Sequence, residues 1–158
     1  IFILGYDDTA PEKWPEFVYD PGDLAEIRRT GYSLAEIQTK VKQYASEYGI
    51  DENIAMKLVN MESGFNPFAV SSAGAKGLMQ LMPQYYPGVD YYDPDSNLEA
   101  GMKALDSYFD RFGLGWSKVL SAYNAGPTKT QEDIDKYGEN WWLGMYDETK
   151  RYIKAILY

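Results

Sequence analysis

The most informative part of the chain is the segment 61–83, which reads MESGFNPFAVSSAGAKGLMQLMP. Apolar residues recur at helical spacing up to this segment, and with Asp51 as the cap they predict a helix that ends at Gly64: Ile54, Ala55, Leu58, Val59 and Met61. After Gly64 the chain is rich in Gly, Ser, Ala and Pro, and from Gly77 to Met82 it turns apolar. We therefore expect an ordered loop that leads into a short helix.

Glu62 is the residue of this segment that we single out for chemistry. On the predicted helix it lies in phase with Ala55, Leu58 and Val59, so its carboxyl group belongs to the apolar face. Burial raises the pKa of a carboxyl group, and an acid that stays protonated near neutrality can donate a proton and later accept one. The alternative is a frayed helix end, at which the side chain is simply solvated.

Apolar periodicity predicts further helices on both sides of this segment. A capping box at Ser33–Glu36 begins a helix that stops at Gly49, and one at Ser96–Glu99 begins a long helix that ends at Gly113. Further helices are predicted for residues 116–125, 131–137 and 147–157. The predicted fold is therefore all-α, with one domain over residues 33–158. Residues 1–32, interrupted by three prolines, are predicted to form an extended N-terminal arm or a junction to a larger parent protein.

Composition and charge exclude several classes of function. The 158 residues include 15 Lys and Arg against 24 Asp and Glu, and the resulting net charge of −9 disfavours nucleic acid as a partner. The absence of His and Cys removes His-dependent triads, thiol nucleophiles and zinc sites, so proton transfer falls to carboxylates or tyrosines. The opening apolar run is too short to span a membrane, and because the first residue is not Met we expect a processed product or a piece of a longer protein.

We expect neither a metal nor a cofactor. The run Asp93–Asn97 begins like a calcium-binding loop, but the sixth position is Leu98 rather than Gly and the twelfth is Ala104 rather than Glu.

Four blocks of sequence, in order along the chain, together resemble the signature of the soluble lytic transglycosylases: residues 62–83, 93–101, 122–127 and 148–153. The resemblance covers about residues 33–158 and implies the lysozyme-like fold of the goose-type enzymes. It also implies cleavage of the β-1,4 bond between N-acetylmuramic acid and N-acetylglucosamine of peptidoglycan without water, which leaves a 1,6-anhydromuramic product. Such an enzyme can work with one carboxylate where most glycosidases need two. By this resemblance Glu62 protonates the leaving oxygen and then deprotonates the 6-hydroxyl of the substrate.

The resemblance also implies roles for residues around Glu62. Ser71 and Gln80 match positions that contact the N-acetyl and glycan groups, and Met79 matches the floor of the cleft. Tyr123 and Asn124 lie in the second signature and are expected to bind substrate, Asn124 at a substrate-contacting position. Tyr152 matches the tyrosine that orients the catalytic carboxyl group. Taken from the residues alone, Met79 also suits core filling, Ser71 a turn, and the two tyrosines a packed interior.

Two other functions compete with this interpretation. A goose-type muramidase on the same fold would direct water with a second carboxylate, for which Asp90, Asp93 and Asp95 are the candidates. The other is a non-catalytic module that binds glycan or forms part of an envelope-penetrating complex.

We expect the partner to be the glycan strands of peptidoglycan, in the periplasm or cell envelope or as a phage virion component that acts on the wall. Because the domain is acidic and wall polymers are anionic, we also expect a larger parent protein, or an envelope or virion complex, to deliver it.

Overall fold

A computed structural model describes residues 31–158; residues 1–30, which hold most of the predicted arm, lie outside the described residues. The described chain is helical, and its elements in order are α2 (Leu34–Glu47), α3 (Glu52–Ser63), α4 (Pro94–Phe112), α5 (Trp116–Ala125), α6 (Pro127–Tyr137), the short 3₁₀ helix η1 (Gly138–Leu143) and α7 (Asp147–Leu157). Among these residues the only β-type pairing is two isolated bridges in the loop between α3 and α4.

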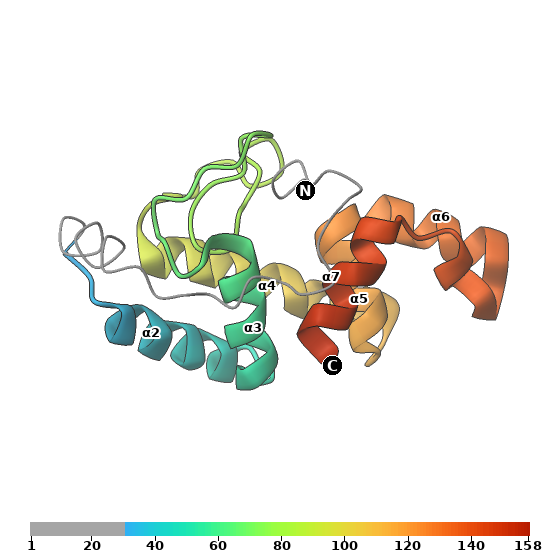
Figure 1. Ribbon diagram of the computed structural model, residues 1–158, viewed down its shortest axis with the longest axis horizontal. Helices are drawn as coiled ribbons and strands as arrows, with labels where there is room; N and C mark the ends of the chain where they lie inside the picture. Colours follow the sequence, from blue (N-terminus) through green and yellow to red (C-terminus); the bar gives the residue numbers. More distant parts are fainter. Residues whose placement is uncertain (1–30) are drawn as a thin grey trace.

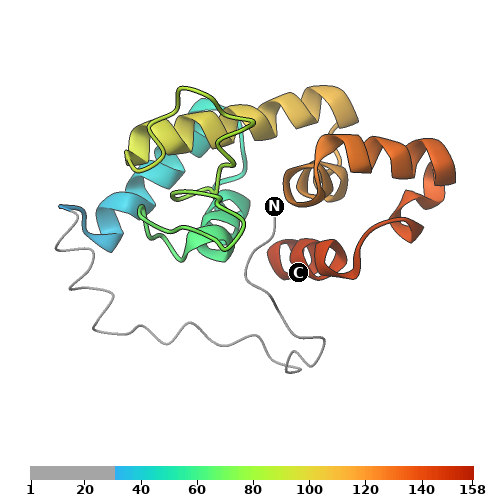
Figure 2. The ribbon, with the colours of Figure 1, turned by 90° about the horizontal axis from the view of Figure 1, so that it is seen from above.

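The helices form two groups that α4 joins, as Figures 1 and 2 show from two directions. One group holds α2, α3, the long loop 64–93 and the first part of α4. The other holds α5, α6, η1 and α7. Besides α4, which contacts α2 and α5, the two groups meet where α3 packs against α7. The end of α3, which carries Glu62, is therefore placed beside a helix that lies far along the sequence.

One continuous apolar core runs through both groups, because each helix turns one apolar stripe inward. Its fully buried members come from α2, α3, the loop, α4, α5 and α7, and include Ile37, Val41, Leu58, Leu78, Leu98, Met102, Leu120 and Ile156. No helix of residues 31–158 is both long enough and apolar enough to cross a membrane.

The short helix predicted from Gly77 to Met82 is absent, and this expectation was wrong. The backbone of Lys76 instead pairs with that of Leu81 in both directions, with N···O distances of 3.0 Å, so the chain makes a tight turn. Gly77 and Gln80 have φ values of 75° and 52°, in the left-handed region that a right-handed helix does not use. A Cβ on Gly77 would lie 2.1 Å from the Tyr91 carbonyl oxygen, so glycine is required at this close approach.

The predicted helix ends are confirmed where a capping residue marks them, as at Ser33, Asp51, Gly64 and Gly113. The capping box at Ser96–Glu99 is wrong, because α4 already begins at Pro94, and Asp93 caps it by accepting a hydrogen bond from the Ser96 N–H. Helix α6 begins at Pro127 rather than at residue 131, because proline fits the first turn of a helix, where its missing N–H is not needed. The 3₁₀ helix η1 was not predicted.

Candidate active site

Glu62 lies in the last turn of α3, and its side chain is only 6% exposed. The side chains one turn earlier, Leu58 and Val59, are completely buried, so the carboxyl group sits in the apolar interior that the phase of the helix predicts. The solvated alternative for this residue is therefore wrong. Two residues after Glu62, Gly64 ends the helix with a left-handed φ of 59°, and the chain then enters the loop 64–93.

The partner of Glu62 comes from the other end of the chain. The Tyr152 hydroxyl on α7 donates a hydrogen bond of 2.6 Å to Glu62 Oε1, and both groups are buried. The second oxygen, Oε2, is buried and has no hydrogen-bond partner in the described part of the chain. Burial raises the pKa of Glu62 to about 8, against the opposing effect of the Tyr152 hydrogen bond. At neutral pH the group is therefore mostly a neutral acid.

Other tyrosines surround this carboxyl group. Burial raises the pKa of Tyr86, Tyr123 and Tyr152, and the negative charge that Glu62 can carry raises each of them further. The Tyr86 hydroxyl also interacts with that of Tyr108 on α4. These phenols all stay protonated at neutral pH, so Glu62 is the titrating member of the cluster.

The loop 64–93 carries three of the predicted site residues. Met79 is completely buried, and its carbonyl oxygen accepts a hydrogen bond of 2.6 Å from the Tyr123 hydroxyl on α5. The Gln80 side-chain amide donates to the Ala69 and Gly77 carbonyls within the loop. The Ser71 hydroxyl accepts a hydrogen bond of 3.0 Å from the Ala75 N–H and closes a turn. Each of the three thus has a part in the structure of the loop.

Asn124, the remaining predicted residue, lies next to Tyr123 on α5 and is buried. Its Oδ1 accepts a hydrogen bond of 2.8 Å from the Thr149 hydroxyl on α7. The structure therefore brings Glu62 together with Tyr152, Met79 with Tyr123, and Asn124 with α7. The contacts of these residues with a substrate stay predictions.

Two residues near the site were not predicted. Asn97 on α4 is buried, and its side chain forms hydrogen bonds with three backbone groups of the loop 64–93. Thr149 is buried against Asn124. Asn97 lies inside one of the resemblance blocks, and its position one residue before the apolar Leu98 places a polar side chain beside the buried stripe. A polar side chain beside the apolar stripe of a helix was therefore the sequence feature that could have identified Asn97, as it identified Glu62.

The three aspartates considered as a second carboxylate are all engaged in structural contacts, two of them local and one between helices α2 and α4. Asp95 pairs with Lys40 at 2.7 Å, Asp93 caps α4, and Asp90 accepts a hydrogen bond from the Tyr92 N–H. Within residues 31–158, no group of three or more His, Cys, Asp or Glu side chains is placed to hold a metal ion.

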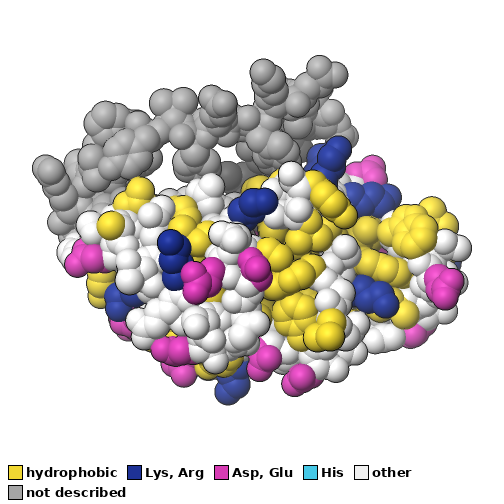
Figure 3. All heavy atoms as spheres, turned by 90° about the horizontal axis from the view of Figure 1, so that it is seen from below, with side chains coloured by type: hydrophobic (Ala, Val, Ile, Leu, Met, Phe, Trp, Pro, Cys, Tyr) yellow, Lys and Arg dark blue, Asp and Glu magenta, His cyan; other side chains and the backbone are white. Residues whose placement is uncertain are grey.

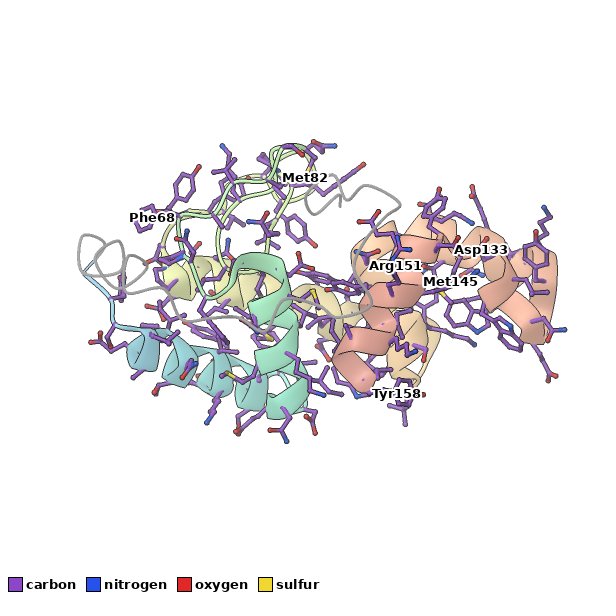
Figure 4. The ribbon with its side chains drawn as sticks, in the orientation of Figure 1. Phe68, Met82, Asp133, Met145, Arg151 and Tyr158 are labelled. Atoms are coloured by element: carbon purple, nitrogen blue, oxygen red, sulfur yellow. The ribbon has the colours of Figure 1, made fainter. Side chains whose placement is uncertain are left out.

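Two open hollows in the surface of the described residues lie away from Glu62. One is lined by residues of α2 and α4, of the loops that follow them and of the first residues of α3 and α5, among them Tyr48, Asp106, Phe109 and Trp116. The other is lined by Trp141, Trp142, Met145, Lys150, Ile153 and Tyr158, in the half of the molecule where Figure 3 shows a band of apolar side chains. In Figure 4, Met82 on the loop and Arg151 on α7 lie on either side of the junction between the two helix groups, where α3 meets α7.

Comparison with known proteins gives consistent results. The membrane-bound lytic murein transglycosylase C of Haemophilus influenzae (strain PittEE) is 36% identical, over 54% of this chain and 30% of that protein. The soluble lytic murein transglycosylase of Escherichia coli (strain K12) is 28% identical, over 73% of this chain and 21% of that protein. The chain therefore spans about a third or less of the length of these relatives.

The fold is also similar to a solved structure. The lytic transglycosylase Slt of Pseudomonas aeruginosa, solved as an inactive mutant with glutamine in place of a glutamate, superposes with a TM-score of 0.65 and 25% identity, over 76% of this chain and 22% of that one. The predicted all-α, lysozyme-like fold is confirmed.

The comparison that covers the site most directly is with a family profile. Residues 39–141, which make up more than half of the chain and include Glu62, the loop 64–93 and Tyr123, match the profile described as "Transglycosylase SLT domain". The chain belongs to this transglycosylase SLT domain family.

Proposed function

We propose that this domain is a peptidoglycan lytic transglycosylase in which Glu62 is the single catalytic acid and base. The observation that carries the proposal is the buried Glu62–Tyr152 pair, in which one carboxyl oxygen is held and the other has no protein partner among the described residues. The family and the lytic murein transglycosylases among its relatives support the choice of substrate.

We place the acidic proton on the Glu62 oxygen that Tyr152 does not contact. Tyr152 donates to Oε1, so that oxygen acts as an acceptor, and the proton of the neutral acid sits on Oε2. Because Oε2 has no partner in the described residues, its proton is not committed to another protein group. Burial keeps the group protonated up to a pH of about 8, so the acid is available at neutrality.

The proposed reaction uses the Glu62 carboxyl group twice, first as an acid and then as a base. In the first step Glu62 gives its proton to the glycosidic oxygen of the leaving N-acetylglucosamine as the bond from C1 of N-acetylmuramic acid to that oxygen breaks. In the second step the 6-hydroxyl of the same N-acetylmuramic acid attacks C1 and returns its proton to Glu62. The new C1–O6 bond gives the 1,6-anhydro product, and no water is consumed. The N-acetyl group of the substrate stabilises the positive charge at C1 between the steps.

We assign Ser71, Met79, Gln80, Tyr123 and Asn124 to the glycan-binding side of this site. Hydrogen bonds within the loop 64–93, between the loop and α5, and between α5 and α7 hold these side chains or their backbone in place. The hydrolytic alternative is less well supported, because Asp90, Asp93 and Asp95 are each engaged in a structural contact.

For the whole protein we propose a location in the cell envelope, where its murein transglycosylase relatives are expected to meet their substrate. Because the whole chain carries a net charge of −9 and wall polymers are anionic, we further propose that a larger parent protein or an envelope or virion complex brings it to the wall.

The test is mass spectrometry of the soluble fragments that the domain releases from purified peptidoglycan. We expect 1,6-anhydromuramic ends with the wild type and none with Glu62→Gln. Glu52→Gln, the same change at an exposed position of the same helix, is the matched control and should leave the products unchanged.

Other products would reject the proposal in distinguishable ways. Reducing ends would mean that water is the acceptor and that the domain is a muramidase. Release of no fragments by the wild type, with binding of glycan retained, would identify a non-catalytic module.

A further inference from the structure

Asn97 is a buried residue whose side-chain amide forms hydrogen bonds only with backbone groups of the loop segment 76–91, among the bonds of the described residues. It lies in the first turns of α4 and is 1% exposed. Its Oδ1 accepts a hydrogen bond of 2.8 Å from the Met79 N–H. Its Nδ2 donates to the carbonyl oxygens of Lys76, at 3.1 Å, and Tyr91, at 2.9 Å. One side chain thus ties both ends of the loop segment 76–91 to α4.

Met79 is held from a second side as well. While Asn97 binds its N–H, the Tyr123 hydroxyl on α5 donates to its carbonyl oxygen at 2.6 Å. The Met79 side chain packs onto Gly101 of α4, where a Cβ would lie 2.2 Å from the methionine sulfur. Both backbone polar groups of one buried residue are therefore fixed by side chains from two different helices.

We call these two hydrogen bonds, from Asn97 and Tyr123 to the Met79 backbone, the Met79 clamp. The residue that follows Met79 has an unusual backbone conformation. Gln80 follows Met79 with a φ of 52°, a backbone conformation that is unfavourable for a non-glycine residue and persists only when its surroundings impose it. The turn that results lets the Gln80 amide donate to Gly77 and Ala69 and keeps the loop in its shape.

We propose that Asn97 and Tyr123 are positioning residues that clamp Met79 and so fix the loop 64–93 in the conformation that binds glycan. The inference rests on the proposed function and adds to it, because it gives Asn97 a role and moves the Tyr123 hydroxyl from substrate contact to support of the loop. The clamp acts on substrate binding, whereas the Glu62–Tyr152 pair acts on proton transfer.

The chemistry of the clamp requires an amide at position 97. The position faces one N–H and two carbonyl oxygens, so it must accept once and donate twice, which Asn does and Asp does not. An ionised Asp would place a negative charge against two carbonyl oxygens in a buried site, whereas a protonated Asp restores one of the two donated bonds. The damage done by Asn97→Asp should therefore grow as the pH rises.

The test measures KM and kcat on solubilised peptidoglycan for the wild type, Asn97→Asp and Tyr123→Phe, with Asn53→Asp on an exposed position of α3 as the control. We expect each clamp variant to raise KM by about tenfold or more, because a misplaced loop weakens binding. The ratio of the KM of Asn97→Asp to that of the wild type should be larger at pH 8 than at pH 5. The Tyr123→Phe ratio should not change with pH.

A purely structural role predicts a different result, namely fewer active molecules and so a lower apparent kcat at an unchanged KM. Either that result, or wild-type kinetics in a folded variant, overturns the proposal. Circular dichroism establishes which variants are folded, and if Asn97→Asp is not, Tyr123→Phe decides alone because it removes one hydroxyl only. A wild type that yields no anhydro product rejects the proposed function itself, which is a separate outcome.

Discussion

Two opposing effects set the proton affinity of Glu62. Removal from water favours the neutral acid, and the hydrogen bond from Tyr152 favours the carboxylate. Burial prevails and places the pKa at about 8. In a fully exposed position the same hydrogen bond would hold the pKa below its usual value of 4.5, and the group would already have lost its proton at neutral pH. The buried position at the end of α3 is therefore what suits this residue to general acid catalysis.

The raised pKa predicts how stability depends on pH. The folded state holds the Glu62 proton up to about pH 8, whereas the unfolded chain releases it near 4.5, so the unfolded state binds fewer protons in between. The contribution of this group is therefore present below pH 4.5 and is lost as the pH rises, by roughly 3 kcal/mol between pH 4.5 and 7. The Glu62→Gln side chain cannot ionise, so this variant should not show the part of the stability loss that comes from position 62. Urea unfolding of both proteins across this range checks the prediction, and parallel curves would contradict it.

Tyr152→Phe should alter the pH profile of activity as well as its level. Without the hydroxyl, Glu62 loses the hydrogen bond that lowers its pKa, so the alkaline limit of activity should move to higher pH. The carboxyl group also loses its orientation, and we expect kcat to fall by about tenfold or more. The measurement is a pH profile of kcat/KM. Tyr158→Phe, at an exposed position of the same chain end, should behave as the wild type, and an unshifted limit in Tyr152→Phe would refute the argument.

The phase of a helix revealed Glu62, but its partner could not be found in that way. Glu62 and Tyr152 are 90 positions apart, and only the packing of α3 against α7 brings them together. Tyr152 was identified because the block 148–153 resembles a family signature. Asn97 had the same favourable phase as Glu62 and was still missed, since nothing local shows that its partners are backbone groups some 20 residues earlier.

At the scale of the elements, helices were predicted well because their signals are local. A cap such as Ser33 or Asp51 and a stop such as Gly64 lie within a few residues of the apolar stripe that they bound. The loop 64–93 was not predictable in the same way. Its apolar run looks helical, but its conformation depends on α4 and α5, which hold Met79. The close approach of the Tyr91 backbone and the Asn97 side chain leaves glycine as the one residue that fits at position 77.

Gly77→Ala should therefore destabilise the domain by two effects, the unfavourable backbone conformation of alanine at a positive φ and a steric clash of the added Cβ. Its φ of 75° disfavours alanine, and the added Cβ would lie 2.1 Å from the backbone oxygen of Tyr91. Gly74→Ala is the matched control, since its φ of 87° is equally unfavourable but no atom lies within 4 Å of the added Cβ. We expect a loss of about 1 kcal/mol for Gly74→Ala and of about 3 kcal/mol or more for Gly77→Ala in urea unfolding. Equal losses of stability in the two variants would mean that the backbone at Tyr91 moves away from the added Cβ at little cost, and would contradict the prediction.

At the scale of the whole molecule, the candidate site is assembled at the contact between the two helix groups. One group supplies Glu62 and the loop, and the other supplies Tyr152, Tyr123 and Asn124. Movement of the groups against each other would separate the acid from the residue that orients it, so α4 and the α3–α7 contact matter for chemistry as well as for stability.

The charge of the whole chain predicts weak binding to its proposed substrate. With a net charge of −9, the chain is repelled by anionic wall polymers, and salt screens this repulsion over a length of about 10 Å at 0.1 M. Cosedimentation of the Glu62→Gln variant with purified sacculi should therefore be weak at low salt and should increase as salt is added. A basic wall-binding protein would show the opposite trend. Tight binding at low salt that falls as salt rises would mean that a local positive surface outweighs the net charge, and the proposed need for a delivering parent or complex would then be withdrawn.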